Sequence, residues 1–531
     1  MTLGLALGGA ATCLSFVLRP STFVLVSGLV LAWGIACLGG TPASEPSSPS
    51  VTAPFSFESL RLRARQMAAQ AYHRPSAPDL PDFLKKLSWA DYQAIRFRPE
   101  QAPWHGEGLP FQLGFVHRGG LFQDAVRIHL LVEGQVHDFL FVPEQFDYGG
   151  NHFPKPVPPD LNFAGLRVLY GFEPHGQPQE VASFLGASFF RLAGEHQRLG
   201  AAARGLAIDT AEPNGEEFPQ FTEFWIERPP KQAKSLQLYA LLDSPSVAGA
   251  YHFVLKPGET TVMALEASLF LRKEIKKPGF AALTSMFLVG QNRTRFIPDY
   301  RPQVHDSDGL LFHGPEGEWV WRPLVNPPKT HRLTEFPLTD PEGFGLEQRD
   351  RNFYDYEDLA NRYELRPSLW VVPQGKWGQG RIELVEIPSP AENNDNIVAY
   401  WIPQQKPVPG HEFHWACSLS AGSAEESSPT LLHVLSTRIA PEHEKIPPLF
   451  VIDFGGPPPT WLASKAPVAG KTQASSGEVK NLVTEKNEVT GGWRVSFNLE
   501  AAAGQPVQIR AWLRSEGHAL SETWVYDLEN P

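Results

Sequence analysis

Short runs in which apolar and polar residues alternate recur through most of the chain, and this pattern sets the fold class. In the stretch 125–142, Val126, Ile128 and Leu130 alternate with polar neighbours, and Glu-Gly at 133–134 precedes a second such run. This arrangement predicts an antiparallel hairpin. Similar runs, such as "SLQLYALLDS", "GAYHFVLKPGETTVMALEASLFLR" and "RIELVEIP", extend the series. We therefore expect an all-β protein built on a large antiparallel sandwich.

The length of the chain predicts more than one domain. A chain of 531 residues is too long for a single compact core. The stretch "PQQKPVPGHE" (403–412) is typical of a linker, and beyond it strand-like runs recur at a spacing of roughly ten residues. We predict a large β-sandwich domain over residues 51–403 that carries the chemistry. An immunoglobulin-like β-sandwich is predicted over residues 404–531.

Two helical segments are expected before the strands. In the stretch 56–72, Phe57, Leu60, Ala64 and Met67 fall on one helical face, and the preceding serine can cap the helix. The stretch 80–95 predicts a second, short helical region, in which a serine and an aspartate have the spacing of a capping box.

The first 50 residues have the character of an export segment. Residues 21–40 form an apolar run, and residues 41–50 are small and polar, as expected after a signal sequence. An uncleaved membrane anchor is the alternative, and Cys37 raises the further alternative of a lipoprotein. With two of the three cysteines in this segment, Cys417 is expected to be a buried strand residue without a disulfide.

The net charge of −12 argues against nucleic acid as a partner, because binding to a duplex requires a basic face. A neutral polar ligand is more consistent with this composition.

The stretch "HDSDG" (305–309) places Asp306 and Asp308 around a serine. A calcium loop of the EF-hand type is excluded, since Leu310 and Leu311 stand where an oxygen ligand and a glycine are needed. No HExxH or CxxC motif supports zinc, so we expect no metal. Taken alone, the stretch is best explained as a turn, because Asp, Ser and Gly favour turns.

A second acidic stretch, "PAENNDNIVAYW" (390–401), places Glu392 and Asp395 before an apolar run. Cleavage of a glycosidic bond uses two carboxyl groups, one as acid and one as base or nucleophile. Such pairs are commonly far apart in sequence, so Asp306 and Asp395 could meet across a cleft. The spacing leaves this as one alternative beside ordinary turns.

Aromatic and basic residues lie between the two acidic stretches. Aromatic rings stack on the faces of sugars, although one of Trp319 and Trp321 is expected in a core. The charged segment 349–368 is interpreted either as a solvated loop or as a lid over a polar ligand. The candidate ligand-contacting residues from this region are Trp319, Trp321, Arg351, Tyr356, Tyr363 and Arg366.

Several longer motifs together resemble a known family. They include "FLGASFFRLAGEHQRLGAAARGLAIDTAEPNGEEFPQFTEFWIERP", "RPQVHDSDGL", "GFGLEQRDRNF", "YELRPSLWV" and "IELVEIPSPAENNDNIVAYW". The chain is similar to the periplasmic glucan biosynthesis proteins of the G and D types from about residue 55 to 401, and more loosely beyond. The resemblance implies a mutarotase-like β-sandwich followed by an immunoglobulin-like domain, a periplasmic location, and a ligand with a β-1,2-linked glucose backbone.

The resemblance also implies roles for individual residues, because the family includes inverting β-1,2-glucanases. On their pattern Asp306 is the general base and Asp395 the general acid, with Glu392, Tyr363 and Arg366 around the cleft. Asp308 is ranked below Asp306 as a site residue, since some members of the family carry Asn at this position.

The implied activity needs neither metal nor cofactor. The implied partners are the glucan and an inner-membrane glucan synthase. The alternative is a non-catalytic protein that holds and presents nascent glucan.

Overall fold

The computed structural model describes most of residues 54–528. The gaps in the described part are 76–78, 174–175, 293–296, 315–316, 424–430, 444–445, 464–465, 503 and 505. The predicted export segment and Cys37 lie outside the described residues. None of the helices in the described part is both long and apolar enough to cross a membrane.

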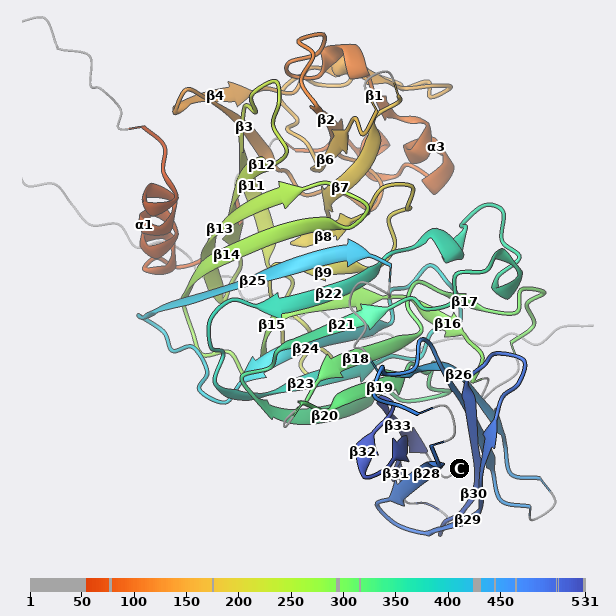
Figure 1. Ribbon diagram of the computed structural model, residues 1–531. Coiled ribbons are helices and arrows are strands. Elements are labelled where there is room, and N and C mark those ends of the chain that lie inside the picture. Colours follow the sequence, from red (N-terminus) through yellow and green to blue (C-terminus); the bar gives the residue numbers. More distant parts are fainter. Residues whose placement is uncertain are drawn as a thin grey trace, which may run out of the picture. The chain divides into compact units, whose positions relative to one another are not determined.

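Two sheets form the large sandwich, and the all-β prediction is confirmed (Figure 1). Within the described ranges, the first sheet runs in the order β2 (Phe111–Val116), β6 (Gly165–Tyr170), β7 (Gln179–Leu185), β8 (Phe189–Leu192), β9 (Ala202–Arg204), β15 (Pro278–Ser285), β24 (Ile397–Pro403), β23 (Gln379–Glu386) and β20 (Arg332–Thr339), with β10 (Ala207–Ile208) paired to β15.

The second sheet continues beyond the sandwich. Its main part runs in the order β18 (Gly309–His313), β21 (Gly343–Glu347), β22 (Ser368–Pro373), β25 (Glu412–Gly422), β14 (Thr261–Leu271), β13 (Val247–Lys256), β12 (Leu236–Asp243), β11 (Gln220–Glu227), β3 (Arg127–Val132) and β4 (Gln135–Phe139). The predicted hairpin at 125–142 is confirmed as β3 and β4, with Val132 opposite Gln135 and Glu133 and Gly134 at positive φ in the turn.

The main core lies between these sheets because alternate residues of each strand point inward. In β13, for example, Tyr251, Phe253 and Leu255 are fully buried. Cys417 of β25 is buried in the same core without a disulfide, as expected, and burial raises the pKa of its thiol to about 12.

The C-terminal strands enclose a second core. One layer consists of β26 (His433–Ala440), β27 (Leu449–Gly455), β30 (Trp493–Glu500) and β29 (Glu478–Lys486). The other consists of β28 (Val468–Ala474), β31 (Val507–Ser515), β32 (His518–Ala519) and β33 (Thr523–Leu528). Strand β19 (Trp319–Pro323) pairs with β33 in parallel and with β18, and so joins this layer to the large sheet.

Residues 54–531 form one compact unit, so the predicted domain boundary at residue 403 stays a prediction. However, β25, which follows that boundary, pairs with β14 and β22 in the large sheet (Figure 1). Ten consecutive registered pairs with β14 assign this strand to the large sandwich by its hydrogen bonding. The linker-like stretch 403–412 therefore connects two strands of that sandwich, β24 and β25.

Short helices precede the strands, as predicted. Helix α1 (Phe57–Ala68) is capped by Ser56 and packs Leu60 and Ala64 against the sheet face that carries Trp225. Helices α2 (Asp82–Lys85) and α3 (Trp89–Ala94) account for the second region, and Ser88 accepts a hydrogen bond from the Asp91 N–H.

Small elements complete the fold near the predicted site. Strands β16 (Phe287–Val289) and β17 (Val304–His305) pair beside the ends of β15 and β18. The segment after β21 contains two 3-10 turns, η4 (Phe353–Asp355) and η5 (Tyr363–Leu365). The remaining short pair is β1 (Arg96–Phe97) with β5 (Phe146–Asp147), near the turns η1 (Pro99–Gln101) and η2 (Pro143–Gln145).

Candidate active site

Asp306 occupies the bend between β17 and β18. Its backbone N–H donates to the Met286 carbonyl at 2.8 Å, which fixes the bend beside β15. The residue is 6% exposed, and the Arg366 guanidinium lies 3.4 Å from its Oδ1. Among the described residues, no donor reaches this buried Oδ1 with hydrogen-bond geometry. A buried carboxylate oxygen without a hydrogen bond is rare and points to a functional requirement.

The charges around Asp306 identify its neighbours. Burial raises the pKa of Asp306, because the charged form loses hydration. The positive charges of Arg366 and Arg191 lower the pKa of Asp306. The negative charges of Asp395 and Glu392 raise it further. Asp395 is thus near enough to Asp306 for their charges to interact, although the two residues come from different segments.

Asp395 lies in the turn before β24 with 34% of its side chain exposed. The next residue, Asn396, is buried and holds the turn: its amide donates to the carbonyls of Phe287 and Ile387 and accepts from the Phe287 N–H. Asp395 Oδ2 accepts a hydrogen bond from Arg191 Nη2 at 3.1 Å. Within the sequence "NNDN", the side chain of Asn396 therefore anchors the turn, and the side chain of Asp395 is partly exposed to solvent.

Both arginines are anchored on the same piece of backbone. Arg191 of β8 donates from Nε to the Gly200 carbonyl at 3.0 Å, and Arg366 donates from Nη1 to the Leu199 carbonyl at 2.5 Å. A Cβ at Gly200 would lie 2.9 Å from Arg366 Cδ, so a side chain at this position would collide with the arginine. Our site prediction omitted Arg191 and Gly200, although both lie in the first long motif that carries the family resemblance.

Glu392 and Tyr363 are in contact beside this pair of aspartates, and their predicted role in binding substrate stays a prediction. The Tyr363 hydroxyl donates to Glu392 Oε2 at 3.0 Å, and the Tyr363 ring centroid lies 5.2 Å from the Arg366 guanidinium. Arg301 Nη1 is 2.6 Å from the same Glu392 oxygen and 2.6 Å from Asp358 Oδ2. Hydrogen bonds to backbone and side chains offset burial and lower the pKa of Asp358 to about 2. Arg301 therefore ties the turn that carries Glu392 to the segment after β21.

Tyr356 and Arg351 lie behind the site and support it. Tyr356 is fully buried, and its ring centroid lies 5.7 Å from that of Tyr363. Arg351 donates to the Arg366 carbonyl and, at 3.1 Å, to Ser368 Oγ. These contacts fix the backbone from which Tyr363 and Arg366 project. The segment 349–368 is therefore packed against the sandwich at these positions, although the predicted ligand contacts stay predictions.

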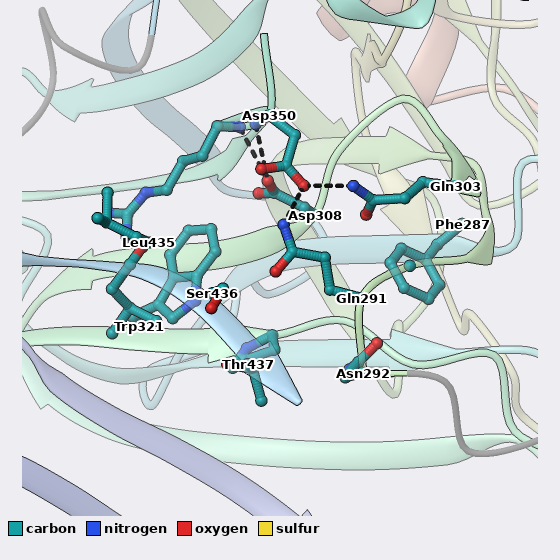
Figure 2. A pocket seen from close by; sticks show the side chains of 14 residues that line it. Phe287, Gln291, Asn292, Gln303, Asp308, Trp321, Asp350, Leu435, Ser436 and Thr437 are labelled. Carbon is teal, nitrogen blue, oxygen red and sulfur yellow. Dashed lines mark hydrogen bonds between the residues drawn. The ribbon is translucent and has the colours of Figure 1, made fainter. Parts of the chain in front are cut away.

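The neighbours of Asp308 differ from those of Asp306. Figure 2 shows its carboxylate facing that of Asp350, in a small cavity that also borders β26. Asp308 Oδ2 accepts from the backbone N–H groups of Arg349 and Asp350, at 2.9 and 3.3 Å. Asp350 Oδ2 accepts from the amides of Gln291 and Gln303, both at 2.7 Å. Burial, followed by the charge of Asp350, raises the pKa of Asp308 to about 8. Two buried carboxyl groups whose charges repel each other are more easily held when one of them is protonated.

The structure also places Trp319 and Trp321 outside the aspartate site. Residues two apart on a strand share a face, so both belong to the C-terminal core rather than one of them. Trp321 is 4% exposed and lies beneath the Arg349 guanidinium, 3.7 Å from the ring centroid. Trp319 stacks on Trp370 with a centroid distance of 5.6 Å. The observed contacts of both tryptophans are packing contacts, and these contacts do not support the expectation that the two rings bind sugar.

A cavity of about 360 Å³ reaches Asp395. Arg191 and Asp395 provide its charged edge, while Phe122, Phe189 and Phe221 contribute apolar wall. A concave, partly aromatic surface with a few polar groups at one edge is typical of small-molecule and sugar sites. Within the described part of the chain, no three or more His, Cys, Asp or Glu side chains are grouped to hold a metal ion.

Comparisons with known proteins identify the family of this chain. The family model described as "Periplasmic glucan biosynthesis protein, MdoG" matches residues 55–528. Glucans biosynthesis protein G of Ralstonia nicotianae is 44% identical over 484 residues, which cover 89% of this chain and 95% of that relative. A family match over nearly all of the described chain, together with this identity, is decisive. The chain belongs to the periplasmic glucan biosynthesis protein (MdoG) family.

Proposed function

We propose that this protein is an exported, periplasmic glycoside hydrolase that cleaves β-1,2-linked glucan with inversion, using Asp395 as the general acid and Asp306 as the general base. The observation that supports the proposal is that these two carboxyl groups, from separate segments, lie near enough for their charges to interact, and that Asp395 lies at the edge of a cavity. An inverting mechanism needs such a pair, one group on each side of the scissile bond.

The surroundings of the two aspartates suit these different tasks. Asp306 is buried, its Oδ1 accepts no hydrogen bond from the described residues, and its raised pKa makes it a stronger base than an exposed aspartate. Asp395 is partly exposed in a turn, where it can reach the oxygen of a bound glycosidic bond. The base removes a proton from water as the water attacks, and the acid protonates the departing sugar oxygen.

Neighbouring groups would orient the sugar. Glu392 is in contact with both Tyr363 and Arg301. Together the three side chains offer hydrogen-bond donors and acceptors. Because these side chains are held by one another, they would hold a bound sugar in one orientation and lower the entropic cost of reaching the reactive geometry. The N-terminal apolar segment is proposed to direct export.

A second candidate function is glucan binding without cleavage. The name of the Ralstonia relative refers to biosynthesis, and a protein that holds nascent glucan and presents it to an inner-membrane synthase would also satisfy that description. In that case Asp306 and Asp395 would accept hydrogen bonds from sugar hydroxyls, and their loss would weaken binding.

Incubation of the purified protein with linear β-1,2-glucan, followed by chromatography of chain lengths, separates the two functions. We expect the wild type to shorten the chains and Asp395→Asn and Asp306→Asn to lose this activity. Asp82→Asn, at an exposed position on α2, serves as a matched control and should retain it. Glucan of unchanged length after incubation with the wild type would exclude the hydrolase. Binding that weakens in the two variants would then favour the holding function.

A further inference from the structure

A second concave surface lies along the ends of β22, β23, β24 and β25, and we call it the Trp377 groove. Its volume is about 1090 Å³. The half-buried rings of Trp377 and Phe413 form its floor, above the buried rings of Trp401 and Trp415. The ring centroid of Trp377 lies 6.1 Å from that of Trp401 and 6.2 Å from that of Trp415, so this half-buried ring packs on an aromatic layer.

The loop that carries Trp377 is held in place by hydrogen bonds. Asp340 Oδ1 accepts from the Gly378 N–H at 2.7 Å, and the Asp340 N–H donates to the Gly378 carbonyl at 2.9 Å. The Ala416 carbonyl accepts both from the Gln374 N–H at 3.0 Å and from Trp377 Nε1 at 3.3 Å. A rigid loop loses little conformational freedom on binding, which favours recognition of a ligand.

One polar atom at the groove has no hydrogen-bond partner among the residues that the structure describes. Trp415 lines the groove and is 5% exposed, yet its Nε1 makes no hydrogen bond within the described part of the chain. An indole N–H is a donor only, and buried indole N–H groups usually find an acceptor. This N–H is therefore an unsatisfied donor beneath the surface of the groove, within the described part of the chain.

The rim of the groove carries four neutral amides beside two lysines, Lys376 and Lys406. The exposed side chains of Gln374, Gln379, Gln404 and Gln405 belong to it. Glu412, a carboxylate on the wall, is ion-paired with an arginine of α1 at 2.6 Å. Amides offer both donors and acceptors, and aromatic rings stack on C–H faces, so the combination suits a neutral polyhydroxylated ring compound.

The groove is separate from the aspartate site. Asp395 precedes β24, whereas Trp401 and Pro403 of the groove lie at the other end of that strand. A strand rises about 3.3 Å per residue, so the seven residues of β24 span about 20 Å. Figure 1 agrees, because β16 and β17 lie at the opposite end of the sandwich from the beginning of β25.

We propose that the Trp377 groove is a second carbohydrate-binding site, which holds a stretch of the glucan chain away from the aspartates. The identity of the ligand rests on the proposed function, whereas the existence of the site rests on the groove itself. A second site on a polymer ligand raises the effective concentration of the chain at the first site. The stretch 403–412, interpreted from sequence as a linker, would form part of the wall of this binding site.

The test is calorimetric titration of a short linear β-1,2-linked glucose oligosaccharide into the full chain that carries Asp395→Asn, which prevents cleavage. We expect two oligosaccharides per protein. Adding Trp377→Ala should remove one of them and weaken the binding of long glucan by about tenfold. Because Trp377 also packs against the core, Gln374→Ala with Gln404→Ala provides an independent, exposed groove variant. Trp461→Ala, at an exposed tryptophan outside the groove, is the control.

The outcomes separate this proposal from the proposed function. If one oligosaccharide binds and the groove variants abolish it, the groove is supported and binding at the aspartates fails. The proposal of a second site is overturned if both groove variants bind oligosaccharide with the same stoichiometry and affinity as the chain that carries Asp395→Asn alone. It is also overturned if the chain with Asp395→Asn alone binds no oligosaccharide.

Discussion

Replacing Asp308 by asparagine is predicted to stabilise the protein as the pH rises. Asparagine has the same shape, and its side-chain oxygen can accept the two backbone N–H bonds that Asp308 Oδ2 accepts now. Its amide can then donate toward Asp350. The variant is therefore a permanent copy of the protonated state, in which the like-charge repulsion of the two carboxylates is absent.

The magnitude follows from the pKa. The folded protein raises the pKa of Asp308 from 3.8 to about 8. Each unit corresponds to about 1.4 kcal/mol, so the largest cost of ionising this side chain is about 6 kcal/mol, shared between two interacting carboxyl groups. The native state binds the proton more tightly than the unfolded state. The contribution of Asp308 to stability is therefore most favourable below about pH 4 and becomes less favourable as the pH rises toward about 8, where the loss levels off.

The assay is urea unfolding at several pH values between 5 and 8, followed by tryptophan fluorescence, to which Trp321 beside this cavity can contribute. We expect the free energy of unfolding of Asp308→Asn to exceed that of the wild type by at least about 1.4 kcal/mol at pH 8, a difference that shrinks toward pH 5. The exposed variant Asp82→Asn should show no such trend. A difference independent of pH, or a variant less stable than wild type at pH 8, would refute the reasoning.

Two further substitutions test other contacts. Gly200→Ala should push Arg366 away from its place beside Asp306 and reduce glucan shortening at least about tenfold, whereas Gly150→Ala, which has open space around it, should leave the rate unchanged. Activity of the Gly200 variant equal to wild type would contradict the anchoring role. Arg322→Ala should lower the free energy of unfolding by about 3–5 kcal/mol, because it leaves the buried Glu386 carboxylate without its partner, and a loss below about 1 kcal/mol would contradict this.

Local patterns in the sequence predicted local structure well. The hairpin of β3 and β4, the capping serine of α1 and the burial of Cys417 all depend on residues close together in the chain. Their side-chain periods and turn chemistry are set by neighbours within a few positions. The all-β class follows from many such patterns together.

Directions of side chains at a bend were harder to predict. Asp306 and Asp308 are two residues apart, which on a regular strand would place them on one face. The bend between β17 and β18 interrupts the strand, so one carboxylate faces Arg366 and the other faces Asp350. This geometry depends on hydrogen bonds to distant strands, which a single sequence does not reveal.

The core to which a strand belongs was also hard to predict, because it depends on pairing with strands that are distant in the sequence. The stretch 403–412 has the composition of a linker, yet the next strand, β25, pairs inside the large sheet. Trp319 and Trp321 were assigned to a sugar site by residue type, but β19 joins β33 and directs them into the C-terminal core. In both cases the partner strand decides the outcome.

The anomeric configuration of the first product is the most direct test of paired action by Asp306 and Asp395. Proton NMR of linear β-1,2-glucan during the first minutes of incubation reports the new reducing ends before they equilibrate. If water attacks from the Asp306 side while Asp395 protonates the leaving oxygen, these ends are α. New ends in the β configuration would require a covalent intermediate or a different pair of groups, and would contradict this account.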